Sequence, residues 1–246
     1  MVQRSPIFLE HVFLEKGLIM KLTLATLVAF TFVTTLSLAA VSGSVNFSGT
    51  APKAEAIKMS ADPACAKANA KPVMKEDVVV NANKTLANVF VYVKEGVKKE
   101  SVPAAPTTPV KLDQSGCRYA PHVIALRVGQ PLQIVNSDSV MHNVHSMSKQ
   151  SNSFNMGMAT KGQSIEKKLT KPEVMMKVKC DVHGWMTSYI SVMEHPYFAF
   201  SDDKGGFSID GLPDGDYTFE AVHEKLGAKT AKAKVAGGVA KVDFAF

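Results

Sequence analysis

The sequence predicts an all-β protein, and three kinds of pattern support this fold class. In residues 174–180, every second side chain lies on one apolar face, and the side chains between them lie on the opposite face. This two-residue period is typical of a half-buried strand. Residues 88–93 form a dense run of β-branched and aromatic side chains. Turn-forming clusters at 202–205 and 213–216 separate short apolar runs near the end of the chain. The only helix we expect is short and lies within 63–69.

The expected strands follow one another along most of the chain. Pro103, Pro106 and Pro109 mark an irregular connector between the second and third of them. Residues 136–139 are turn-forming and end the fourth strand. The strands are expected at 41–47, 88–93, 122–128, 131–135, 174–180, 189–193, 198–200, 206–209, 217–222 and 241–246.

Four side chains that can bind a soft metal ion follow the ends of two expected strands, those at 131–135 and 174–180. Cys180, His183 and Met186 lie within seven residues, directly after the strand at 174–180. His142 follows the strand at 131–135 and its turn. One thiolate, two imidazoles and one thioether suit copper, which is bound by His₂Cys in a plane with a weak axial Met. We expect these strand ends to meet at one pole of a β-sandwich.

These residues resemble those of the cupredoxins, the blue copper proteins of the amicyanin and plastocyanin type. The resemblance covers residues 110–193 and depends on the Cys-x2-His-x2-Met loop and on His-Asn-Val-His at 142–145. It implies a Greek-key β-sandwich with one type 1 copper ion. The strong ligands would be His142, Cys180 and His183, and Met186 would be the axial ligand. The backbone N–H of Asn143 would point at the thiolate.

The chain departs from this family where prolines are common, because Met141, Val182 and Gly184 occupy those positions. A dedicated zinc site is an alternative, although zinc rarely takes a thioether. A c-type haem would need Cys-x-x-Cys-His, which the sequence lacks.

The resemblance implies an electron carrier whose partner is a dehydrogenase or c-type cytochrome, with the electron leaving through the ring edge of His183. The alternative is a copper-delivery protein that handles Cu(I) with the help of Met156, Met158 and His145. We expect no enzyme, because four protein ligands leave no open position for a substrate.

The C-terminal part carries a second resemblance. Residues 201–217 are similar to the carboxypeptidase regulatory-like, or transthyretin-like, β-sandwich. Residues 194–246 are too few for that fold alone, so the strands at 41–47 and 89–93 are candidates for the missing ones. The cupredoxin-like segment 110–193 would then interrupt this sandwich, with 41–109 before it. Two sequential domains remain the alternative.

The N-terminal segment predicts export. Residues 22–40 are almost wholly apolar or Ser/Thr, follow Met20-Lys21 and end in the small residues typical of signal peptidase cleavage. We therefore expect residues 1–40 to be a signal peptide, with Met20 as an alternative start and an uncleaved anchor as the competing interpretation. The protein would be periplasmic or secreted, with no membrane span after cleavage. The net charge of +6 comes from scattered lysines, and nucleic acid is not an expected partner.

The three cysteines allow one disulfide if Cys180 holds the metal. Cys65 and Cys117 would then pair in an oxidising compartment. The alternative is that either of them, or His122, belongs to a second metal site. The other histidines and aspartates considered as possible ligands are expected to have structural roles or to form turns. They are His145, His195, His223, Asp202, Asp203, Asp214 and Asp216.

Overall fold

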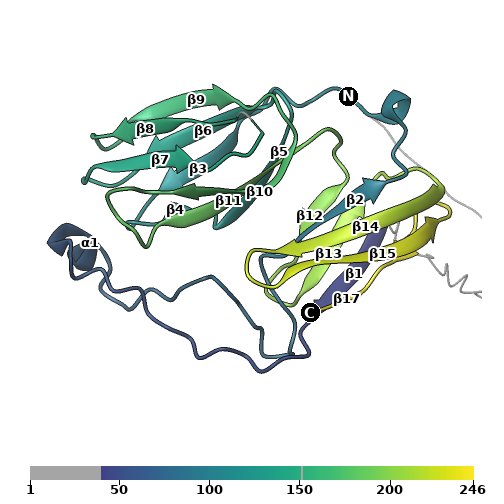
Figure 1. Ribbon diagram of the computed structural model, residues 1–246, viewed down its shortest axis with the longest axis horizontal. Coiled ribbons are helices and arrows are strands. Elements are labelled where there is room, and N and C mark those ends of the chain that lie inside the picture. Colours follow the sequence, from purple (N-terminus) through teal and green to yellow (C-terminus); the bar gives the residue numbers. More distant parts are fainter. Residues whose placement is uncertain (1–39, 151) are drawn as a thin grey trace, which may run out of the picture. The chain divides into compact units, whose positions relative to one another are not determined.

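The computed structural model describes residues 40–150 and 152–246, all of which belong to one compact unit, Leu38–Phe246. Residues 1–39 of the predicted signal peptide lie outside the described residues, and its last residue, Ala40, is the first residue of β1 (Ala40–Asn46). The described part is built from strands β1 to β17, one short α-helix and one 3₁₀ turn, which confirms the all-β fold class (Figure 1). No helix in these residues has the length and apolar character needed to cross a membrane.

Strands β3 to β11 form a β-sandwich that carries the predicted metal ligands. Side chains from both of its sheets share one core, which includes Leu112, Ile134, Val178 and Ile190. One sheet has the order β4 (Tyr119–Ala120), β3 (Val110–Gln114), β6 (Pro131–Asn136) and β9 (Ser164–Lys168). The other has the order β5 (Val123–Arg127), β11 (Thr187–Met193), β10 (Glu173–Lys179), β7 (His142–Ser146) and β8 (Asn155–Met158).

The pairing of β7 with β10 explains how two distant ligands meet. The two strands are antiparallel neighbours, with Lys179 opposite His145. The start of β7 and the end of β10 therefore lie at the same end of the two paired strands. His142 opens β7, and Cys180 directly follows β10. His142 and Cys180 thus lie close together as predicted, but His142 is at the start of β7, a strand that was not predicted, and the strand at 131–136 belongs to the other sheet.

The alternation in β10 holds over only part of the strand. Met176, Val178 and Cys180 are buried as predicted, but Val174 is 37% exposed. The pairing register with β11 shifts between Glu173 and Met176, and Met175 has φ of +51°. Such a bulge inserts one extra residue and turns the preceding side chain to the opposite face. The prediction that Val174 faces inward was therefore wrong.

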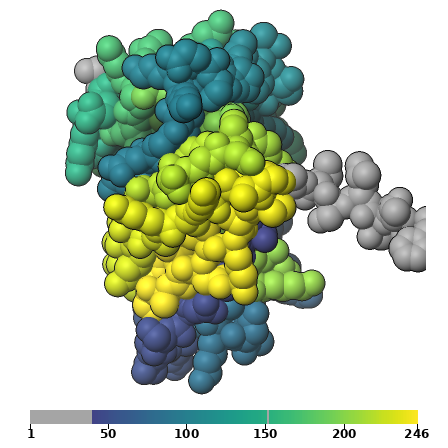
Figure 2. Space-filling model, turned by 90° about the vertical axis from the view of Figure 1, so that its right-hand side faces the viewer, coloured from purple at the N-terminus to yellow at the C-terminus, as the bar shows by residue number. Residues whose placement is uncertain are grey.

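A second sandwich is assembled from both ends of the described chain. One sheet joins β1 (Ala40–Asn46) to β13 (Gly206–Asp210), β16 (Ala240–Lys241) and β17 (Phe244–Ala245). The other has the order β12 (Phe198–Phe200), β2 (Phe90–Glu95), β14 (Gly215–His223) and β15 (Gly227–Val235). Purple N-terminal and yellow C-terminal residues accordingly adjoin in Figure 2.

This pairing places β2 next to β12 and β14 rather than in the sandwich formed by β3 to β11. It is the pairing expected if residues 110–193 interrupt the second sandwich. Strand β15 was not predicted, because its alternation of Ala and Lys has weak β-propensity. It forms along nine residue pairs with β14. The 3₁₀ turn, Lys99–Ser101, lies in the connector after β2.

The connection between β1 and β2 makes a long excursion that carries helix α1 (Pro63–Ala68) (Figure 1). The helix lies where the sequence predicts it: Asp62 caps its N-terminus and Pro63 opens its first turn. Cys65 of this helix belongs to the core of the sandwich formed by β3 to β11. It forms a disulfide with Cys117, with the Cα atoms 5.6 Å apart, and this confirms the predicted pairing.

Candidate metal centre

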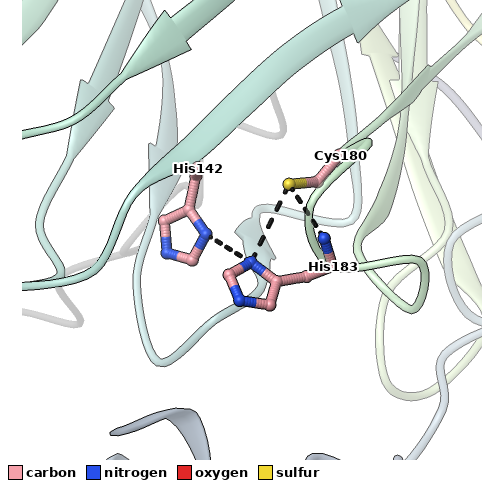
Figure 3. A group of neighbouring side chains, drawn as sticks. All are labelled: His142, Cys180 and His183. Carbon is pink, nitrogen blue, oxygen red and sulfur yellow. Dashed lines mark hydrogen bonds between the residues drawn. The ribbon is translucent and has the colours of Figure 1, made fainter. Parts of the chain in front are cut away.

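Three of the four predicted ligands converge on one buried point. The donor atoms of His142, Cys180 and His183 all lie within 4.8 Å of one another. The side chains point toward a common centre from the start of β7 and from the loop after β10 (Figure 3). Their exposed fractions are only 0%, 2% and 2%. The sequence therefore brings a thiol and two imidazoles together in a site shielded from water.

The two imidazoles face each other through their inner nitrogens. Nδ1 of His142 lies 2.9 Å from Nδ1 of His183 (Figure 3). Each outer nitrogen, Nε2, donates to a carboxylate: that of His142 to Asp138 at 2.9 Å and that of His183 to Asp62 at 3.0 Å. When both rings are neutral, each carries its single N–H on Nε2, and both Nδ1 atoms then present free lone pairs to each other.

Two bare lone pairs at this distance repel each other unless a cation lies between them. Imidazole nitrogens bind metal ions such as zinc at about 2.0–2.1 Å, so two nitrogens 2.9 Å apart can share one ion. The outer hydrogen bonds to carboxylates are those that orient and strengthen metal-bound histidines. The donor set and its surroundings thus fit a bound metal ion.

The protonation of the site follows from its burial and its carboxylates. Burial lowers the pKa of His142, and this outweighs the opposite effect of Asp138. The hydrogen bond from His183 is the main cause that lowers the pKa of Asp62. The structure therefore favours neutral His142 beside charged Asp62, the forms that suit a ligand and its supporting carboxylate.

Cys180 is held by its loop and by the neighbouring strand. Its Sγ lies 3.9 Å from Nδ1 of His183 and accepts a hydrogen bond from the backbone N–H of His183 at 3.3 Å. Asn143 contacts the thiol with its side chain, whose Oδ1 lies 3.3 Å from Sγ and also accepts the N–H of Asp181. The sequence interpretation assigned the contact to the backbone N–H of Asn143, whereas the structure shows a side-chain contact.

Met186 closes the ligand loop. Its backbone N–H donates to the carbonyl of His183 at 2.9 Å, and its carbonyl accepts the N–H of Cys180 at 3.2 Å. The side chain is 1% exposed and belongs to the core of the same sandwich. These bonds fix the turn that carries the thioether. The assignment of Met186 as axial ligand stays a prediction.

The outer edge of His183 is covered. Cys65 Sγ lies 3.6 Å from its Nε2, and the ring of Trp185 packs against it with centroids 5.0 Å apart. The Trp185 indole N–H donates to the carbonyl of Cys117 at 3.0 Å. The ring edge through which we expect the electron to leave is therefore covered by Trp185 and Cys65 in this structure, and the exit route stays a prediction.

The sequence interpretation missed both supporting carboxylates. Asp138 lies four residues before His142 in the expected turn, where its side chain also accepts the N–H groups of Gly116 and Cys117. That spacing was a usable signal. Asp62 and His183 are 121 residues apart in the sequence, and no local sequence pattern predicts that they are in contact.

The other candidate residues are kept apart from this centre. His145 pairs with Asp181 at 3.0 Å, and His122 with Glu224 at 2.7 Å. Met158 is fully buried in the core, where it acts as a filler. Four further residues form hydrogen bonds with backbone groups. His195 contacts the carbonyl of Val93, and His223 accepts hydrogen bonds from the backbone N–H groups of residues 225 and 226. Asp202 and Asp214 accept hydrogen bonds from glycine N–H groups in turns.

Comparison with known proteins gives similarity to solved structures only. No family model matches the chain, and no curated protein matches it. A Cu-containing nitrite reductase (NirK) from Thermus scotoductus SA-01 is 24% identical over 42% of this chain and 25% of its own, with a TM-score of 0.34. The chain thus spans a quarter of that reductase.

Two other solved structures match over nearly their whole length. A purple cupredoxin from Nitrosopumilus maritimus is 22% identical over 34% of this chain and 98% of its own, with a TM-score of 0.30. The P96G mutant of amicyanin is 20% identical over 42% of this chain and 98% of its own, with a TM-score of 0.32. Each similarity covers less than half of the chain.

Proposed function

We propose that this chain is an exported electron carrier with one type 1 copper ion, held by His142, Cys180 and His183, with Met186 as the weak axial ligand. One observation carries the proposal. Two buried imidazoles present bare nitrogens to each other at 2.9 Å, beside the only free cysteine of the described residues. A thiolate with two imidazoles and a thioether is the donor set of copper that cycles between two oxidation states.

The surroundings of the site support electron transfer rather than catalysis. All three strong ligands are at most 2% exposed, so no substrate reaches an open coordination position without movement of the chain. Copper, when bound, supplies the exchange of a single electron. The chain holds the imidazoles in fixed orientations through Asp62 and Asp138, which keeps the change of geometry between oxidation states small.

Delivery of Cu(I) is the second candidate, and the structure gives it less support. That proposal needs Met156, Met158 and His145 as additional donors, and of these Met156 is partly buried and packs against the core of the sandwich formed by β3 to β11. Met158 is fully buried and its Sδ accepts a hydrogen bond from Gln114, while His145 is engaged by Asp181. Neither side chain is therefore free for an incoming ion.

Export and a redox partner complete the proposal. The Cys65–Cys117 disulfide is typical of proteins in oxidising compartments, which agrees with the signal peptide expected at 1–40. The partner would be a dehydrogenase or c-type cytochrome. We also propose that the second sandwich is transthyretin-like, with its first strands, β1 and β2, supplied from before the metal-binding segment.

The decisive experiment is spectroscopic. Purified protein is loaded with Cu(II), and visible and electron paramagnetic resonance spectra are recorded for wild type and Cys180→Ser. We expect an intense thiolate-to-copper band that the variant loses. Asp203→Ala, at an exposed turn position away from these cysteines, is the control and should keep the band. A colourless wild type, or a band that survives in Cys180→Ser, would rule out the proposed ligands.

A further inference from the structure

A second group of donors lies on the outer side of the ligand histidines. Cys65 Sγ and a carboxylate oxygen of Asp62 lie 3.6 Å and 3.0 Å from Nε2 of His183. The donor atoms of these three residues fall within 4.8 Å of one another. Cys117 brings a second sulfur to the same place, because it is the disulfide partner of Cys65. None of these groups is a ligand in the proposed copper site except His183, which uses its other nitrogen there.

Asp138 extends this group on the side of His142. The sulfur of Cys117, a carboxylate oxygen of Asp138 and a ring nitrogen of His142 also lie within 4.8 Å of one another. Two N–H groups fix this carboxylate, those of Gly116 and Cys117, both at 2.8 Å. Two sulfurs thus lie between two carboxylates, an arrangement whose negative charge attracts a cation once the sulfurs are thiolates.

We propose that Cys65 and Cys117, when their disulfide is reduced, form a second metal site that binds one Cu(I) ion. Reduction breaks the S–S bond and adds two electrons and two protons, supplied by a dithiol that itself becomes a disulfide. Cu(I) then displaces the two thiol protons and is bound by both sulfurs. Paired thiolates are soft ligands and select Cu(I) over harder ions.

The backbone already has the spacing that this site needs. Two thiolates that share an ion at about 2.3 Å each lie no more than about 4.6 Å apart. The Cα atoms of Cys65 and Cys117 are 5.6 Å apart, so rotation of the two side chains is enough to open the sulfurs to that separation. Both cysteines are at most 1% exposed, which protects the bound ion from water, whereas the side chain of Asp62 is 29% exposed and offers an approach for the ion.

The consequence is a copper content that depends on thiol redox state. The reduced chain binds one more Cu(I) ion than the oxidised chain. When thiol–disulfide exchange with a disulfide-bonded partner removes two electrons from Cys65 and Cys117, their S–S bond forms again, the partner becomes a dithiol, and the Cu(I) ion is released. This goes beyond the proposed carrier function, because it depends on two sulfurs that the first site does not use.

The test is an anaerobic titration with Cu(I) in competition with a chromophoric Cu(I) chelator. Wild type is compared in its disulfide form and after reduction with a phosphine, alongside Cys180→Ser and the double variant Cys65→Ser/Cys117→Ser. We expect reduction to add one ion per chain in wild type and in Cys180→Ser and to add none in the double variant. Equal copper content in reduced and oxidised wild type would overturn the proposal, as would a gain that persists in the double variant.

Ultraviolet absorption gives a second measurement that does not depend on the double variant folding. In reduced Cys180→Ser the only thiols are those of Cys65 and Cys117. Addition of Cu(I) should therefore produce thiolate-to-copper charge-transfer absorption in the ultraviolet, and its absence would overturn the second site. The blue band of oxidised wild type reports on the first site separately, so the two proposals fail independently.

Discussion

Asp62 accepts a hydrogen bond from Nε2 of His183 at 3.0 Å, although 121 residues separate them. The carboxylate comes from the cap of helix α1, in the connection between the first two strands of the other sandwich. The imidazole lies in the ligand loop after β10. One of the two proposed histidine ligands is thus oriented by a segment outside the sandwich that carries it.

Removal of this carboxylate should weaken metal binding. In Asp62→Ala, His183 loses the acceptor that fixes its tautomer and orientation, and such losses typically reduce metal affinity by about 10–100-fold. The affinity is measured by competition with a chelator of known strength. Asp203→Ala, at an exposed turn position, is the control and should bind as wild type does. Equal affinities in the two variants would show that Asp62 does not support the ligand.

The pairing of β1 with the C-terminal strands can be tested with two glycines. A Cβ on Gly43 would lie 1.6 Å from the carbonyl oxygen of Val242, and backbone atoms cannot yield as a flexible side chain does. We expect Gly43→Ala to lower the free energy of unfolding by about 1–3 kcal/mol or more, the usual cost of overpacking. Gly157→Ala is the control, since no atom lies within 4 Å of its Cβ. Denaturant unfolding measures both, and equal stabilities would refute the pairing.

The disulfide should be a major source of stability. Its cysteines are 52 residues apart, and loop-entropy estimates for a crosslink of that span give about 4 kcal/mol. The double variant Cys65→Ser/Cys117→Ser should lose about that much free energy of unfolding. The measurement uses metal-free protein, so that ion binding does not mask the loss. Unchanged unfolding would mean that the crosslink does not restrict the unfolded chain.

The buried pair His122–Glu224 predicts a specific dependence of stability on pH. Burial lowers the pKa of His122, but the hydrogen bond and charge of Glu224 together raise it above its ordinary 6.5. Burial raises the pKa of Glu224, but hydrogen bonds from His122 and Tyr189 together lower it below its ordinary 4.5. The stabilisation is therefore fully present between these two values.

As pH rises through the raised pKa of His122, the contribution of the pair should be lost, and it should also be lost as pH falls through the lowered pKa of Glu224. The check is the free energy of unfolding of metal-free wild type and Glu224→Gln across this range. The advantage of wild type should be largest between pH 4.5 and 6.5. A constant difference at every pH would contradict the assignment.

Many of the strands, and the candidate donors that the structure brings together, could be predicted because their signals are local. The strands β3, β4, β7, β8 and β9 were not predicted. Alternation predicted β10, and donor type and spacing singled out Cys180 and His183 within one loop. The bulge at Met175 could not be predicted, because it arises from pairing with β11 rather than from the residues themselves. Strand β15 was missed for a similar reason: its partner β14, not its composition, makes it a strand.

Contacts that join distant segments were predictable only where chemistry restricts the choice. With Cys180 assigned to the metal, two cysteines remained, so the pairing of Cys65 with Cys117 followed by count. Asp62 is one of many carboxylates in the chain, and nothing in its neighbourhood distinguishes it as the partner of His183.

The covering of His183 by α1 has a consequence for engineering. Residues 110–193 carry all four predicted ligands, and they form a continuous piece that could be excised and grafted onto another protein. Such a graft would leave Asp62 and Cys65 behind, so that His183 would lose its carboxylate and Cys117 its crosslink. The segment that carries the proposed ligands is contiguous in the chain, yet two of the contacts around its site come from residues outside it. A graft that keeps these contacts has to include the part of the connection between β1 and β2 that carries Asp62 and Cys65.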